Sequence, residues 1–177
     1  MKAIKITSLL TVAAVAVYVA LLSSRATGEP SAAFADAGKP APAWTLTDLS
    51  GKVIHSSDLK GKVVVLDFWA TWCGPCRLEI PGFIALQKQY GTQGLTVIGA
   101  SVDEGGAAVV KKFADQMGVN YSVGVADDSL QAAFGGIVGL PTTFIIDRQG
   151  RLVNKHLGLT DQSEFEVELK PLLAQKP

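Results

Sequence analysis

The chain has 177 residues, carries 16 basic and 16 acidic side chains, and contains only two cysteines. This length suits one domain with an N-terminal extension, and it allows a hydrophobic core without metal or disulfide support. The balanced charge gives no reason to expect a nucleic-acid partner, and two cysteines exclude a disulfide-framework protein.

The N-terminal segment is predicted to direct export. Lys2 and Lys5 precede an uncharged, largely apolar run at residues 6–24. Such a run after basic residues is typical of a signal peptide, and its length also approaches that of a membrane-spanning helix. Residues 1–26 are therefore predicted to be a cleaved signal peptide or a retained membrane anchor, and either places the domain outside the cytoplasm. Residues 27–39, rich in Ala, Gly, Pro and Ser, predict a flexible linker to a domain at 40–177.

Short elements are predicted before a central strand. Residues 44–46 and 52–55 flank a turn-rich link and predict a β-hairpin, which one helical turn at 56–59 follows. The apolar run Val63–Phe68 is long enough for a buried strand and too short for a globular helix. Asp67 interrupts this run, and a buried carboxylate is costly unless it is paired or neutralised. Asp67 is therefore either a functional residue or one that faces solvent.

The two cysteines follow this strand. Cys73 and Cys76 enclose Gly74 and Pro75 and precede a helical pattern, an arrangement expected of a redox-active dithiol. Cys73 would cap the helix, where free amides and the helix dipole favour the nucleophilic thiolate over the thiol. Cys76 would lie one turn further on, close enough to form a disulfide with Cys73.

Three other uses of the cysteine pair are weaker. A zinc site would need two more ligands, and the two histidines, His55 and His156, have no paired spacing. Covalent haem attachment needs a histidine directly after the second cysteine, and position 77 is arginine. A structural disulfide closing so short a loop would remove little entropy from the unfolded chain. We therefore expect a redox dithiol that uses no metal and no other cofactor.

The rest of the chain predicts alternating helices and strands. A helix is expected from 73 to about 90, with Leu78, Phe83, Leu86 and Tyr90 near one face, and a strand follows at 95–102. Next come a helix at 106–117 capped by Asp103, a strand at 121–125 and a short helix at 130–134. The chain then predicts a hairpin of 142–147 and 151–157 and a last helix from an Asp161–Glu164 capping box to about 174. This order predicts an α/β fold with a mixed central sheet and helices on both faces.

Three blocks in this order resemble the thioredoxin superfamily, specifically its TlpA/ResA-type extracytoplasmic thiol–disulfide oxidoreductases. They are GKVVVLDFWATWCGPC, the Arg-x-Glu-x-Pro sequence at 77–81, and Gly-Leu-Pro-Thr-Thr at 139–143. The resemblance runs from about Pro42 to the C-terminus. It implies a three-layer thioredoxin-like fold, protein disulfides as substrates, and a membrane thiol carrier as electron donor.

The resemblance also implies roles for residues around the cysteines. The proline matching Pro141 is cis in the family and faces the disulfide, and the backbone of Leu140 would pair with an extended substrate segment. Trp72 is expected at the rim where a partner docks, beside Gly74 and Pro75. The Gly-Pro dipeptide is that of thioredoxin itself, which favours a reducing role.

Two carboxylates compete for the role of proton acceptor. Glu79 lies three residues past Cys76 on nearly the same helix face, where it could take the proton of Cys76 during attack on a mixed disulfide. The family assigns such a role to the glutamate at this spacing, whereas thioredoxins use a buried aspartate at the position of Asp67. The sequence leaves open which residue is the base, and two neighbouring carboxylates would titrate as a coupled pair.

The predicted function is reduction of protein disulfides after export, as in cytochrome c maturation or copper-site assembly. Cys73 would attack a substrate disulfide, and Cys76 would resolve the mixed disulfide. The alternatives are a disulfide oxidase or isomerase, a copper-binding chaperone and a peroxidase. His156, Asp103 and Glu104 are interpreted as structural.

Overall fold

The computed structural model describes residues 34–176. The predicted signal or anchor lies outside these residues, as does the first part of the predicted linker. The described helices include none that is long and apolar enough to cross a membrane. The described end of the linker, residues 34–39, packs on the domain: the rings of Phe34 and Phe144 meet edge to face, and the Gly38 amide donates to the Leu152 carbonyl at 2.7 Å.

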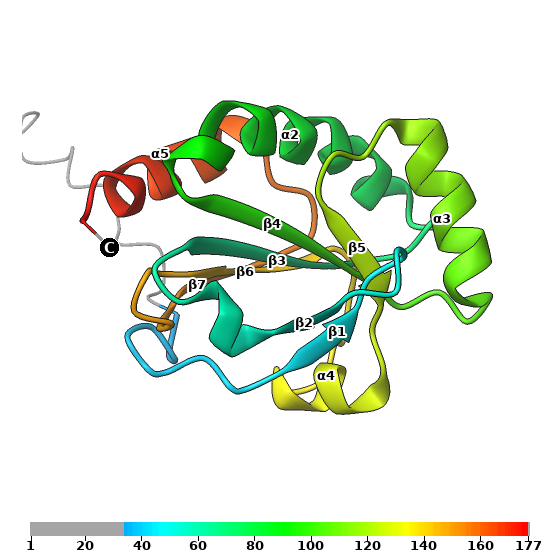
Figure 1. Cartoon of the computed structure of the whole chain (residues 1–177), viewed down its shortest axis with the longest axis horizontal. Helices are drawn as coiled ribbons and strands as arrows, with labels where there is room; N and C mark the ends of the chain where they lie inside the picture. The colour runs from blue at the N-terminus through cyan, green and yellow to red at the C-terminus, as the bar shows by residue number, and fades with distance from the viewer. Residues whose placement is uncertain (1–33, 177) are drawn as a thin grey trace, which may run out of the picture. The chain divides into compact units, whose positions relative to one another are not determined.

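A five-stranded mixed sheet forms the middle layer, with strand order β5-β4-β3-β6-β7 (Figure 1). The central strand β3 (Val63–Trp69) pairs in parallel with β4 (Leu95–Ser101), which pairs in parallel with β5 (Ser122–Val125). On its other side β3 pairs antiparallel with β6 (Thr142–Ile146), and β6 pairs antiparallel with β7 (Leu152–Leu157). Every residue of β3 is buried, as its apolar run predicts.

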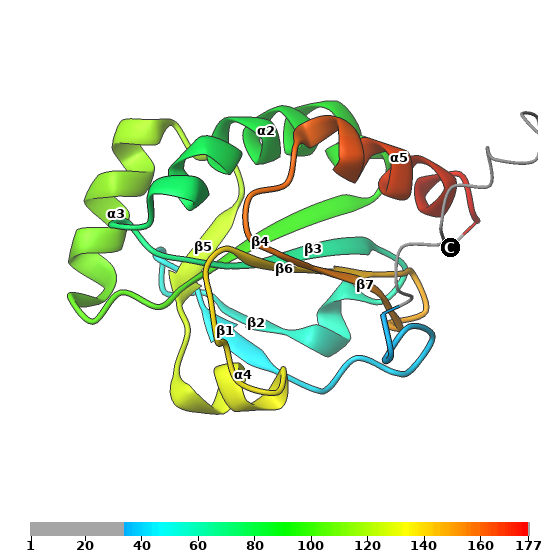
Figure 2. The ribbon, with the colours of Figure 1, turned by 180° about the vertical axis from the view of Figure 1, so that it is seen from behind.

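Layers of chain cover both faces of this sheet, as Figure 2 shows from behind. One face carries α2 (Gly74–Tyr90), α3 (Gly106–Met117) and α5 (Gln162–Leu173), and the other carries α4 (Asp128–Ala133), the hairpin β1 (Thr45–Thr47) and β2 (Val53–His55), and the 3₁₀ turn Ser56–Leu59. The predicted thioredoxin-like α/β fold with its N-terminal hairpin is confirmed.

Alternate residues of β3 face the two outer layers. Val64 and Phe68 join the core beneath α4 and the hairpin, whereas Val65 and Trp69 face the helices on the opposite side. Side chains alternate along a strand, so Asp67 points to the same layer as Val65 and Trp69. The sequence thus places a carboxyl group beneath α2.

Four local expectations differ from the structure. Asp103 does not cap α3, whose N-cap is Gly105. Asp161 is the N-cap of α5, but its side chain makes no capping hydrogen bond, so the capping box does not form.

Leu78 is 69% exposed, because the buried stripe of α2 follows Cys76, Glu79, Ile80 and Phe83 and leaves position 78 on the far side. Helix α4 begins at residue 128 rather than 130, because the Asp127 side chain accepts the Leu130 amide and caps it there.

Candidate active site

The two cysteines lie at the junction of β3 and α2. Cys73 is the N-cap of α2, its sulfur accepts the Cys76 amide at 3.2 Å, and the two cysteines form a disulfide. Pro75 lies in the first turn, where its missing N–H costs no helical hydrogen bond. After reduction, the free amides and the positive end of the helix dipole would stabilise a thiolate on Cys73.

A buried carboxylate fixes the loop before Cys73. Asp103 accepts hydrogen bonds from the Thr71 amide at 2.8 Å and the Thr71 hydroxyl at 2.6 Å, and a third from the Ser101 hydroxyl at 2.7 Å. These bonds hold the side chain away from α3, which is why Asp103 does not cap that helix. The parallel pairing of β3 and β4 brings Ser101 and Asp103 beside Thr71, and no local sequence pattern marks this contact.

A groove of about 490 Å³ lies beside the disulfide. Its lining residues are Trp72, Cys73, Gly74, Pro75, Val102, Gln131 and residues 137–140. Cys73 borders the groove, whereas Cys76 does not and is 1% exposed. Trp72 and Val138 are 70% and 85% exposed, so the rim is apolar and open to a partner.

The structure brings the predicted substrate-binding residues together. Trp72, Gly74, Pro75 and Leu140 all line the groove, and Pro141 is buried next to Leu140. The Leu140–Pro141 peptide bond is cis, as the resemblance implies. Ile137 and Val138 in the groove were not predicted, because two apolar residues in a glycine-rich loop carry no recognisable signal.

Asp67 and Glu79 are buried in the layer between the sheet and α2. Asp67 is 2% exposed and accepts the Thr143 hydroxyl at 3.2 Å, so the alternative that it faces solvent is wrong. Glu79 is 5% exposed, and its Oε1 accepts the Thr160 amide at 2.6 Å. Among the described residues its Oε2 has no hydrogen-bond partner. One oxygen of Glu79 is therefore free to exchange a proton.

Burial decides the protonation of both carboxyl groups. It raises the pKa of Glu79 to about 7, although the Thr160 amide and the charge of His156 oppose the rise. Burial, helped by the charge of Glu79, raises the pKa of Asp67 well above its usual value. Burial and these two carboxylates also raise the pKa of Tyr121 far above the usual range. A proton can therefore be held and released beneath α2 near neutral pH.

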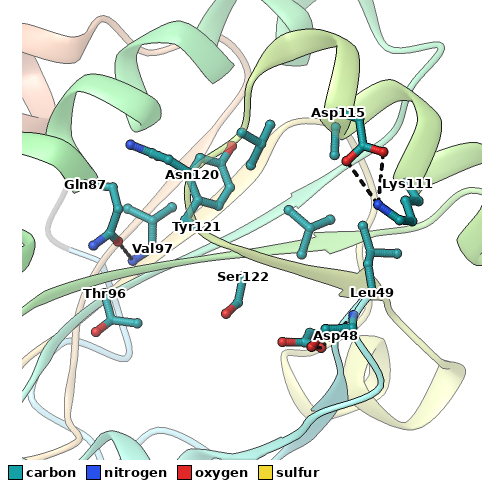
Figure 3. Close-up of a pocket in the computed structure, with 14 residues that line it drawn as sticks. Asp48, Leu49, Gln87, Thr96, Val97, Lys111, Asp115, Asn120, Tyr121 and Ser122 are labelled. Atoms are coloured by element: carbon teal, nitrogen blue, oxygen red, sulfur yellow. Dashed lines mark hydrogen bonds and ion pairs between the residues drawn. The ribbon is translucent and has the colours of Figure 1, made fainter.

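A second hollow, of about 540 Å³, lies beside β5 (Figure 3). Polar side chains such as Asp48, Lys111, Asp115 and Asn120 line it, and Lys111 and Asp115 pair with each other at 2.9 Å. Neither cysteine borders this hollow, so its residues cannot touch the reacting sulfur. Disulfide exchange belongs to the groove beside Cys73.

Comparison with known proteins agrees with this geometry. The model of the AhpC/TSA family matches residues 37–155. Over 137 residues the chain is 40% identical to thiol-disulfide oxidoreductase ResA of Bacillus thuringiensis (strain Al Hakam), covering 76% of this chain and 78% of the relative. Over 126 residues it is 38% identical to ResA of Bacillus subtilis (strain 168), covering 71% and 70%.

A solved structure supports the same assignment. The crystal structure of a thiol:disulfide interchange protein of the thioredoxin family from Chlorobium tepidum TLS superposes with a TM-score of 0.71 at 36% identity. The match covers 76% of this chain and 96% of that one. The chain therefore belongs to the AhpC/TSA family, and its thioredoxin-like fold and cysteine pair make it a thiol–disulfide oxidoreductase.

Proposed function

We propose that this protein reduces disulfides of other proteins outside the cytoplasm, with Cys73 as the attacking residue and Cys76 as the resolving one. The observation that carries this assignment is the position of the two cysteines relative to the groove: Cys73, 5% exposed at the helix N-terminus, borders it, whereas Cys76, 1% exposed, does not. The basic and apolar N-terminal sequence supports export.

The proposed reaction passes two electrons from the protein dithiol to the substrate disulfide. The Cys73 thiolate attacks one substrate sulfur, the substrate S–S bond breaks, and a mixed disulfide forms. Cys76 then loses its proton to Glu79 and attacks the Cys73 sulfur. One substrate sulfur takes a proton from solvent and the other takes the proton that Cys76 passed to Glu79, so the substrate leaves as a dithiol and the protein is left with the Cys73–Cys76 disulfide. We assign the proton to Glu79 rather than Asp67, because Oε2 of Glu79 is unpartnered and its pKa of about 7 matches a working pH near neutrality.

The lining of the groove favours an extended protein segment as the substrate. Its rim is apolar, and Leu140 lies beside the disulfide at the cis peptide bond. We propose client proteins whose cysteines must stay reduced, such as apocytochrome c or copper-site proteins, and a membrane thiol carrier that returns electrons to the dithiol. No cofactor beyond the dithiol is needed.

Reduction of insulin by the wild type, Cys73→Ser and Cys76→Ser tests the assignment. Cys73→Ser should abolish the activity, whereas Cys76→Ser should accumulate a mixed disulfide with the substrate. A reduction potential near that of thioredoxin, about −270 mV, fits a reductase, whereas a value near −120 to −180 mV would indicate an oxidase or isomerase instead.

A further inference from the structure

A row of polar residues crosses the sheet beneath α2 and α5. The strand register sets Asp67 of β3 opposite Thr143 of β6, and Thr143 opposite His156 of β7. Residues directly opposite each other project from the same face of a sheet, so His156 points into the layer that holds Asp67 and Glu79. The Thr143 hydroxyl donates to Asp67 at 3.2 Å. The row therefore runs from the buried centre of the molecule to the edge strand β7.

Helix α5 fixes His156 in this layer. The Nε2 atom of His156 lies 3.1 Å from Oε1 of Glu168, and its ring meets that of Phe165 edge to face with centroids 5.0 Å apart. The Asn154 amide donates to both oxygens of Glu168 at 3.0 and 3.1 Å, so the carboxylate cannot turn away. The side chains of His156 and Glu168 are 14% and 26% exposed, which connects the pair to solvent.

The charged groups that face His156 are carboxyls. Glu168 faces it from α5 at 3.1 Å. Glu79 enters the same layer from α2, where its Oε1 accepts the amide of Thr160, four residues past His156, and Asp67 lies beyond Thr143 on β3. The neighbouring Lys155 points to the opposite face, where its ammonium group lies 5.2 Å from the centre of the Phe144 ring. A carboxylate at the distance of Glu168 stabilises a protonated imidazole. A positive charge on His156 in turn lowers the pKa of Glu79 and of Glu168.

We propose that His156, oriented by Glu168, is a positioning residue for disulfide exchange: its protonated ring favours the ionised form of Glu79 and so sets the pH range in which Cys76 is activated. This proposal rests on the proposed role of Glu79 as proton acceptor. His156 touches neither sulfur, and it acts only through the charge of Glu79.

Proton titration by NMR tests the electrostatic link without reference to activity. Replacing the ring in His156→Gln should move the titration midpoint of the ¹³C-labelled Glu79 carboxyl upward by about 0.5–1 pH unit, because an opposing charge is lost. A second neutral replacement, His156→Asn, should give the same upward shift. The chain has only one other histidine, the exposed His55 at the end of β2, and His55→Gln is the control, which should leave the Glu79 midpoint unchanged. An unchanged Glu79 midpoint in His156→Gln would overturn the proposal, and if that variant did not fold, an unchanged Glu79 midpoint in His156→Asn would do so.

The pH profile of insulin reduction then tests the catalytic consequence. In His156→Gln the acidic limb should move to higher pH, giving roughly a 3- to 10-fold lower rate near pH 6 and little change near pH 8. Adding His156→Gln to Glu79→Gln should change nothing further. An equal loss at every pH would show a purely structural role and contradict the proposal. If Glu79→Gln itself left the profile unchanged, the function proposed for Glu79 would fail, while the NMR titration would still decide whether His156 and Glu79 are linked.

Discussion

At the scale of single residues, Asp67 and Glu79 share a buried layer but differ in what their oxygens contact. Oδ1 of Asp67 accepts the Thr143 hydroxyl, whereas Oε2 of Glu79 has no partner among the described residues. We therefore expect Glu79→Gln to slow resolution of the mixed disulfide on the order of 10²-fold near pH 7, the usual contribution of a general base. Asp67→Asn should slow it less. Rapid-mixing fluorescence of the tryptophans beside the disulfide measures this step, and a larger loss in Asp67→Asn would assign the proton to Asp67 instead.

Single residues were predictable from sequence where the relevant spacing was local. Cys73, Cys76 and Glu79 follow one another along a single helix, so their spacing alone placed them near each other. The Thr160 amide reaches Glu79 across 81 positions, and Thr71 reaches Asp103 across 32. Such contacts depend on how strands pair, which no local pattern encodes.

At the scale of elements, Asp103 joins the end of β4 to the loop that carries the cysteines. Removing its carboxylate in Asp103→Ala leaves three donors from Thr71 and Ser101 without their acceptor, which should lower the free energy of unfolding by about 2–3 kcal/mol. Hydrogen exchange should show the loss of protection concentrated at the Thr71 amide. Asp115→Ala, which removes only an exposed pair with Lys111, is the matched control and should change stability little. Equal protection of the Thr71 amide in both variants would contradict the conclusion that Asp103 holds the loop before Cys73 in place.

The N-terminal hairpin is attached to the sheet at Gly124 of β5. Leu49 donates its amide to the Val123 carbonyl at 2.8 Å, and a Cβ at position 124 would collide with the Thr47 carbonyl. We expect Gly124→Ala to lower the free energy of unfolding by about 1–3 kcal/mol, because the colliding atom is backbone and cannot rotate away. Gly74→Ala is a suitable control, since a Cβ there meets no atom within 4 Å. Thermal unfolding of the two variants gives the comparison, and equal midpoints would refute this close approach.

At the scale of the whole molecule, the sequence predicted the layers but not the order of the strands. Apolar runs such as Val63–Phe68 identified the central strands, turn residues identified the hairpins, and the cysteine spacing identified the helix that follows. The order β5-β4-β3-β6-β7 brings distant segments together, and only the resemblance to thioredoxin-like proteins implied it. The polar row from Asp67 to His156 is a product of that order and is not visible in the sequence.

The buried carboxyl groups also give the whole domain a distinctive dependence of stability on pH. The pKa of Glu79 rises from its usual 4.5 to about 7 on folding, and that of Asp67 rises as well, so the folded state holds these protons more tightly than the unfolded chain. Their contribution to stability is complete below pH 4.5 and is lost as the pH rises through about 7.

We therefore expect the free energy of unfolding of the oxidised protein to fall between pH 5 and pH 8, by about 2.5 kcal/mol from Glu79 alone. Asp48 and Asp127, whose hydrogen bonds with neighbouring residues lower their pKa values, have the opposite effect, but only at lower pH. Denaturant unfolding of wild type, Glu79→Gln and Asp67→Asn across this range measures the slope. Each substitution should flatten it, because an amide has no proton to lose. A wild-type stability that rises from pH 5 to pH 8 would mean that these carboxyls are ionised in the folded protein, and a proton shuttle beneath Cys76 would then lose its physical basis.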